Sequence, residues 1–219
     1  MITIALSPLN LFFMGGKDIN KSTEEKIKAA ARTVLYKKGF AATRTRDIAE
    51  EAGMNLALIN YYFRSKKKLF EIIMSETIAV FAGKLMQILN DQATSLEKKI
   101  ELIAACYIDM FTEEPEMPTF IVSEIRNHPE AMLKRIPVKQ AFSQSYFIKQ
   151  FELAVAAGKV TEPNPFHFIM NLLGLIVFPF IGKPMLMAAA GLNKTQFNQL
   201  MQERKKSIPI WIKAVIKAT

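Results

Sequence analysis

Apolar side chains recur along most of this chain at the three- and four-residue spacing of α-helices, and no segment shows a convincing strand pattern. Ser22 and Glu25 fit the capping box that begins a helix, and Gly39 fits the position after its end. The inward face of this first predicted helix consists of Ile27, Ala31, Val34 and Leu35. The pattern predicts an all-α protein.

Two short helices are predicted next, joined by a turn at Gly53. Thr43 can cap the first of them, whose inward positions are Ile48, Ala49 and Ala52. Gly53 then allows a left-handed turn that other residues resist, and Asn55 caps the following helix. Ile59 and Phe63 lie four residues apart and point into the core. The outer sides of this helix are left to Leu56, Ala57, Asn60 and Tyr61.

Cations follow the third helix directly. Arg64 and the run from Lys66 to Lys68 stand beside Ser65, which can cap a fourth, longer helix towards Asn90. An α-helix fits the major groove, its polar outer side chains meet base edges, and flanking cations neutralise phosphates. Two short helices with a glycine turn and this surface are typical of a helix-turn-helix that binds DNA.

The distribution of charge supports an anionic partner. The formal net charge is +9, and residues 17–70 hold 13 lysines and arginines against six acidic residues. Residues 71–219 hold 16 against 14, so the N-terminal part carries most of the excess. A basic excess of this kind favours nucleic acid or a lipid surface as the partner.

Residues 22–70, about a quarter of the chain, resemble the DNA-binding domain of the TetR family of bacterial transcriptional regulators. The resemblance rests on the phrases "GFAATRTRDIAEEAGM" and "NYYFRSKKKLF", which occur in the family's order and spacing. It implies phosphate contacts from Thr45 and Lys66, and a backbone contact from Tyr62. It also implies a surface that faces bases or their sugars, made of Arg46, Leu56, Ala57, Asn60 and Tyr61.

The chain departs from the family pattern within this region. The family usually has tyrosine at the position of Asn60, histidine at that of Tyr62, and acidic residues at those of Lys67 and Lys68. The change at Asn60 bears on base preference. The two lysines should raise nonspecific affinity, because each adds a cation beside the DNA.

Helical patterns continue beyond residue 90 at 100–111, 119–126, 129–157, 165–187 and 194–217, punctuated by prolines and Gly191. We therefore expect three parts: an N-terminal arm or upstream extension (1–16), a three-helix DNA-binding domain (17–70) and a helical regulatory and dimerisation bundle (71–219). The family resemblance implies that the last two long helices form a homodimer and that the others enclose a small-molecule pocket.

The richness of the C-terminal part in Phe and Met favours an apolar or amphipathic effector. The candidate pocket residues are Met110, Phe111, Phe120, Phe147, Phe151, Met170 and Phe178. Asp109, Glu113 or Glu124 could pair with a polar head group.

Other classes of protein receive less support. Residues 1–16 lack the basic start and cleavage site of a signal peptide, and a start at Met14 or a packed arm explains them better. Residues 166–182 are nearly long enough to span a bilayer, but they contain His167, Asn171 and Pro179. Neither a phosphate loop, a nucleophile motif nor a metal-ligand cluster is found, so no cofactor, metal or enzymatic reaction is indicated.

The sequence thus favours a cytoplasmic, DNA-binding transcriptional regulator, most simply a repressor released by a small molecule, with double-stranded DNA and a second copy of the chain as partners and no membrane. The alternatives are a basic helical protein that associates with membranes, or a helical enzyme of unknown reaction.

Overall fold

The computed structural model describes residues 9–130 and 142–217, with side chains described for 22–130 and 142–215. Every regular element in these residues is an α-helix, which confirms the predicted fold class. The chain divides into two compact units, residues 1–76 and 77–219. Helix α4 (Lys66–Asn90) begins in the first unit and ends in the second.

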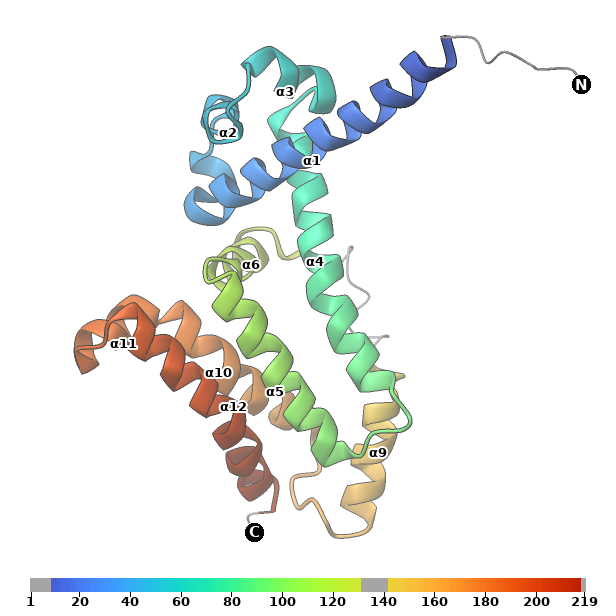
Figure 1. Ribbon diagram of the computed structural model, residues 1–219. Helices are drawn as coiled ribbons and strands as arrows, with labels where there is room; N and C mark the ends of the chain where they lie inside the picture. Colours follow the sequence, from blue (N-terminus) through green and yellow to red (C-terminus); the bar gives the residue numbers. More distant parts are fainter. Residues whose placement is uncertain (1–8, 131–141, 218–219) are drawn as a thin grey trace, which may run out of the picture. The chain divides into compact units, whose positions relative to one another are not determined.

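The first unit contains α1 (Leu9–Ala42), α2 (Thr45–Ala52), α3 (Leu56–Phe63) and the first turns of α4 (Figure 1). Its core is built from the apolar positions that the helical spacing selects. The buried side chains include Ile27, Ala31, Val34 and Leu35 of α1, Ile48 of α2, Ile59 and Phe63 of α3, and Leu69 and Ile73 of α4. The inward faces expected for these helices are confirmed at those positions.

The predicted start of the first helix is wrong. Helix α1 begins at Leu9, so Ser22 lies inside it and residues 9–16 are helical. Glu25, expected to cap a helix beginning at Ser22, forms an ion pair with Lys28 one turn further on (2.7 Å). The predicted end of this helix lies close to the observed one. Gly39 has φ 70° and ψ 172°, which breaks the helical geometry before Ala42.

The predicted cap of α2 is also wrong. Thr43 is buried, and its hydroxyl donates a hydrogen bond to the carbonyl of Gly39 (2.7 Å). Asp47 takes the capping role instead, because its carboxylate accepts a hydrogen bond from the backbone N–H of Arg44 (2.8 Å). The hydroxyl of Thr43 is thus used to close the preceding turn and is not free to cap.

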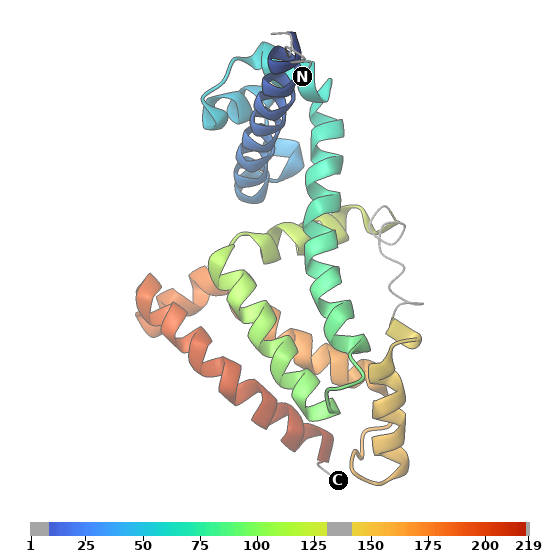
Figure 2. The same cartoon turned by 45° about the vertical axis from the view of Figure 1, so that its right-hand side comes forward.

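The second unit continues with α5 (Leu96–Glu113), α6 (Met117–Asn127), α9 (Tyr146–Ala156), α10 (Pro165–Ile181), α11 (Lys183–Ala190) and α12 (Lys194–Lys217). Figure 2 shows α12 running beside α5, and α10 packs against both. Aromatic contacts join these helices: Phe111 of α5 meets Phe180 of α10 edge to face (5.3 Å between centroids), and Phe180 meets Phe197 of α12 (6.1 Å). Lys205 of α12 pairs with Asp109 of α5 (2.7 Å).

Two sequence expectations for the second unit need correction or qualification. The helix expected over 165–187 is two helices, α10 and α11, bent by 73° at Gly182. Pro184 explains the break, because its ring clashes with the carbonyl of residue 180 and it has no N–H to donate. Of the helix expected over 129–157, α9 is observed, while residues 131–141 lie outside the described part.

Two parts of the described chain are apolar and long enough to cross a bilayer. They are α4 alone and α10 with α11 if the bent pair is taken as one span. Core helices of soluble proteins meet the same criterion, so this property does not choose between a regulator and a membrane protein.

Candidate nucleic-acid interface

Local hydrogen bonds hold α2 and α3 at their junction. Gly53 adopts the left-handed conformation (φ 63°, ψ 33°), and the N–H of Met54 returns to the carbonyl of Ala49 (2.9 Å). Two residues later the side chain of Asn55 accepts a hydrogen bond from the N–H of Ala57 (2.9 Å) and so caps α3. Both features were predicted from the sequence, and together they form the turn of a helix-turn-helix.

The burial of one face of α3 leaves the other face in solvent. Ile59 and Phe63 are buried, whereas Ala57, Asn60 and Tyr61 are exposed, Tyr61 to 75%. Leu56 and Tyr62 are half-buried, and the rings of Tyr61 and Tyr62 meet edge to face (5.3 Å). Among the described residues the amide of Asn60 has no hydrogen-bond partner, so it is available to a base edge.

Helix α2 contributes a second group of polar side chains at its start. Arg46 is exposed, Thr45 is half-buried, and the Arg46 guanidinium pairs with no described residue. Asp47 beside them is occupied: the N–H of Arg44 and then the Lys38 ammonium (3.3 Å) hold its pKa below the usual range. The cationic character of this surface is therefore carried by the arginines and is not cancelled by a free carboxylate of Asp47.

Lys66 differs from the expectation that the resemblance provided. Its ammonium donates hydrogen bonds to the carbonyls of Phe40 and Thr43, both at 2.9 Å. It also lies over the ring of Phe40, 4.2 Å from the centroid. Because an ammonium has three donors, most of its capacity is used within the first unit, which gives Lys66 a role in joining α4 to the end of α1.

Of the cations in the run from Arg64 to Lys68, those that remain in solvent are Arg64, Lys67 and Lys68. None of these three pairs with a described residue. The sequence marked all three as part of a basic run. It contained no signal that distinguished Lys66 from its neighbours, because the two carbonyls that Lys66 contacts lie 26 and 23 residues away in the chain.

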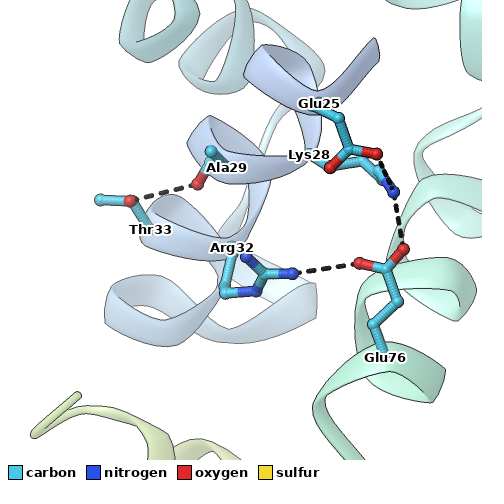
Figure 3. A network of polar contacts seen from close by, with 6 residues as sticks. All are labelled: Glu25, Lys28, Ala29, Arg32, Thr33 and Glu76. Atoms are coloured by element: carbon cyan, nitrogen blue, oxygen red, sulfur yellow. Dashed lines mark hydrogen bonds and ion pairs between the residues drawn. The ribbon is translucent and has the colours of Figure 1, made fainter. Parts of the chain in front are cut away.

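A polar network fixes α1 against the first turns of α4 (Figure 3). Glu76 accepts from Lys28 (2.7 Å) and from Arg32 (3.0 Å), and Glu25 pairs with the same Lys28 (2.7 Å). These contacts raise the pKa of Lys28, Glu25 first and Glu76 second. This network was not predicted from the sequence, since i,i+3 spacing indicates only the Glu25–Lys28 pair.

The candidate pocket residues of the second unit fall into two groups. Met110, Phe111, Phe120, Phe147 and Phe151 are buried, whereas Met170 and Phe178 are 60% and 55% exposed on α10. The two groups do not form one cluster inside the unit. Phe147 and Phe151 do come together around Phe168, with ring centroids 5.3 and 5.7 Å from it.

The three acidic residues suggested for a polar head group also separate. Asp109 is paired with Lys205, and Glu113 is exposed. Glu124 of α6 is only 5% exposed, and its carboxylate forms no hydrogen bond or ion pair with a described residue. Burial raises its pKa, against a smaller opposing effect of His128. No group of three or more His, Cys, Asp or Glu side chains in the described residues could hold a metal ion.

Two short helices joined at Gly53, with a polar outer face on the second and free cations at its end, define a helix-turn-helix DNA-binding protein. Residues 27–73 match the family model described as "Bacterial regulatory proteins, tetR family". Residues 27–73 are therefore a DNA-binding domain of the TetR family, and the chain is a DNA-binding transcriptional regulator.

Relatives over nearly the whole chain agree with this assignment. A probable HTH-type transcriptional regulator of Bacillus subtilis, YttP, is 24% identical over 90% of this chain and 95% of its own. Among solved structures, the putative transcriptional regulator SCO4942 from Streptomyces coelicolor has a TM-score of 0.62 at 17% identity, covering 88% of this chain and 97% of that one. The regulator FadR from Bacillus subtilis, solved in complex with stearoyl-CoA, has a TM-score of 0.60 at 14% identity over 90% of this chain and all of that one. These structures share the fold, and all three relatives are named as regulators.

Proposed function

We propose that the protein is a cytoplasmic repressor that binds a palindromic operator as a homodimer and is released by a small apolar or amphipathic effector. The observation that carries the DNA-binding part is the outer surface of α2 and α3, where Arg46, Asn60 and Tyr61 are exposed and Arg46 and Asn60 have no described hydrogen-bond partner. Thr45, Leu56, Ala57 and Tyr62 complete the surface that we assign to DNA. Lys66 is not part of this surface, because its ammonium donates to the carbonyls of Phe40 and Thr43.

The roles of these residues can be separated by DNA binding at several salt concentrations. Regulators of this type commonly bind beside the genes they control, so the first probe is the DNA upstream of the protein's own gene. Asn60→Ala and Arg46→Ala should weaken binding to that DNA more than to random duplex, by about 1–3 kcal/mol for each base contact. Lys206→Ala, which removes an exposed cation of α12, is the control for net charge. Equal losses on both DNAs for the α2 and α3 variants would contradict the assignment.

The homodimer is supported by an apolar face on α10. Met170, Phe178 and Ile181 are exposed at helical spacing, and Gly174 lies between them with open space around its missing side chain. A large exposed apolar face of this kind marks an interface, and a small residue at its centre lets two helices approach closely. We therefore assign Met170 and Phe178 to the dimer contact rather than to a pocket. One recognition helix alone contacts few base pairs, and a two-fold dimer doubles the site.

The effector is supported by the chemistry of the second unit. Phe111, Phe120, Phe147 and Phe151 provide an aromatic interior, and Glu124 is the one suggested acidic residue that is both buried and unpaired among the described residues. The stearoyl-CoA complex of FadR shows that a regulator with this fold can hold a long acyl chain, and we propose an amphipathic ligand of comparable apolar length. If the ligand favours the non-binding state, operator DNA must weaken the ligand by the same factor. Calorimetry of acyl-chain compounds with and without operator tests this reciprocity, and identical affinities would exclude the compound as effector.

Repression itself requires a separate measurement. A reporter fused to the bound promoter should rise when the gene for this protein is deleted. A fall on deletion would instead identify an activator, while leaving DNA binding intact. Membrane association is the second function to exclude, since α4 is apolar enough to span a bilayer, and flotation with anionic vesicles would detect it.

A further inference from the structure

The connection from α3 to α4 is a strained three-residue turn centred on Arg64. Arg64 has φ 59° and ψ −33°, and it is the one non-glycine residue with positive φ in the described part of the chain. The N–H of Ser65 donates across it to the carbonyl of Phe63 (2.7 Å). A hydrogen bond between these neighbours, with positive φ at the central residue, defines the rarer and strained form of γ-turn. Glycine adopts such a conformation without steric penalty, but arginine does not.

Nothing within the described protein offsets this strain through the arginine side chain. Arg64 is exposed, and its guanidinium forms no hydrogen bond, ion pair or ring contact with a described residue. The turn could be made equally well, and with less strain, by a residue that lacks a side chain. A strained residue that persists without an internal partner suggests a contact made outside the protein.

The surroundings of Arg64 indicate what that external partner is. Arg64 follows α3 directly, and the first turn of α4 contains exposed Lys67 and Lys68 and no acidic residue. Lys66, which lies between Arg64 and Lys67 in the chain, directs its ammonium to the carbonyls of Phe40 and Thr43 instead. A guanidinium offers a planar fork of donors that matches two phosphate oxygens. An anionic partner beside the recognition helix is thus the chemistry that this position suits.

We propose that Arg64 binds a phosphate of the DNA backbone next to the bases contacted by α3, and that the strained turn holds its guanidinium in that position. This inference rests on the proposed DNA-binding function and adds a residue that the family resemblance did not assign. It makes two claims that can be separated: a phosphate contact through the side chain, and a stability penalty through the backbone.

Three substitutions at this one position separate the claims. Arg64→Ala removes the guanidinium and keeps the strain, so affinity should fall about tenfold on operator and random DNA alike, as for loss of one charged hydrogen-bonding group. The slope of log affinity against log salt should decrease by about 0.9 per protomer. Arg64→Gly should lose the same affinity but melt about 2–4 °C above Arg64→Ala, because glycine relieves the strain. Arg64→Lys should keep the salt slope and lose part of the affinity.

Lys206→Ala is the matched control, since it also removes one exposed cation and lies on α12 in the second unit. It should leave the salt slope unchanged. If Arg64→Ala binds DNA like wild type while Arg46→Ala and Asn60→Ala lose operator affinity, the phosphate contact is wrong and the proposed function stands. If the wild-type protein shows no salt-dependent affinity for duplex DNA, the proposed function itself fails. If Arg64→Gly melts no higher than Arg64→Ala, the turn is not strained as proposed.

Discussion

Arg204 of α12 donates a hydrogen bond from its guanidinium to the backbone carbonyl of Leu175 in α10, at 2.7 Å. That carbonyl lacks the usual helical donor, because the residue four positions later is Pro179, which has no N–H. The same guanidinium lies over the ring of Trp211, 5.1 Å from the centroid. Arg204 therefore supplies the hydrogen bond that the proline removes, and in doing so it joins the two helices.

This relationship predicts that the effects of Arg204 and Pro179 on stability are coupled. Arg204→Met should lower the free energy of unfolding by about 1–3 kcal/mol, because a part-buried carbonyl loses its donor. In a Pro179→Ala background the backbone N–H is restored and the loss on Arg204→Met should shrink. A double-mutant cycle from urea denaturation measures the difference. Additive effects of the two substitutions would show that the carbonyl does not connect them.

A second prediction follows from the contacts of Lys66. Lys66→Met should lower the stability of the protein in the absence of DNA by about 2 kcal/mol, because two carbonyls lose a charged donor. Lys67→Met, at an exposed neighbour with no described partner, should leave stability unchanged and reduce the salt dependence of DNA binding. Thermal unfolding and DNA titration of both variants check this. If Lys66→Met changes DNA binding and leaves the melting temperature unaltered, then the phosphate contact implied by the family resemblance holds.

The local features of the DNA-binding unit could be predicted because they depend on neighbouring residues. Asn55 caps a helix that starts one residue later, Gly53 makes a turn of its own backbone, and Ile59 and Phe63 are buried by helical periodicity. The errors arose where a local pattern had a competing use. Ser22 with Glu25 matched a capping box, yet Glu25 pairs with Lys28 inside a longer helix.

The placement of polar groups between helices could not be predicted in this way. The partners of Lys66 and Arg204 are backbone carbonyls far along the chain, which carry no residue-specific signal. The sequence also could not separate the buried Phe151 from the exposed Phe178, because both belong to apolar helices. Only the packing of the second unit distinguishes them.

Burial of Glu124 predicts a dependence of stability on pH. Its pKa is raised in the folded protein, so the folded state binds the proton more tightly than the unfolded chain does. The stabilisation is complete below the unfolded pKa of about 4.3 and is lost as the pH rises through the higher folded pKa. Glu124→Gln mimics the protonated form, and it should therefore melt above wild type near pH 7 and close to wild type near pH 4.

Melting curves of wild type and Glu124→Gln near pH 7 and near pH 4 measure this difference in melting temperature. Glu113→Gln, at an exposed carboxylate of the preceding helix, is the matched control. If Glu124→Gln melts below wild type at neutral pH, then the carboxylate has a stabilising partner and our description of its surroundings is wrong.

The dimer prediction concerns Phe178. Phe178→Asp places a charge on the exposed apolar face of α10, and it should dissociate the dimer by raising the dissociation constant at least about 100-fold, since an aromatic contact is lost and a carboxylate is buried. Val122→Asp makes a similar change at an exposed apolar residue of α6 and should leave assembly intact. Sedimentation velocity at micromolar concentration distinguishes monomer from dimer. A wild-type protein that sediments as a monomer would contradict the proposed assembly.

The turn at Arg64 has a consequence for the mutational history of the protein. Any arginine codon becomes a glycine codon through a single nucleotide change at its first position. A chain selected only for folding should therefore acquire Arg64→Gly readily, since glycine relieves the positive φ. Selection for operator occupancy should retain arginine. Randomising this single codon and passing the library separately through a heat challenge and a repression screen would thus enrich opposite residues at the same position.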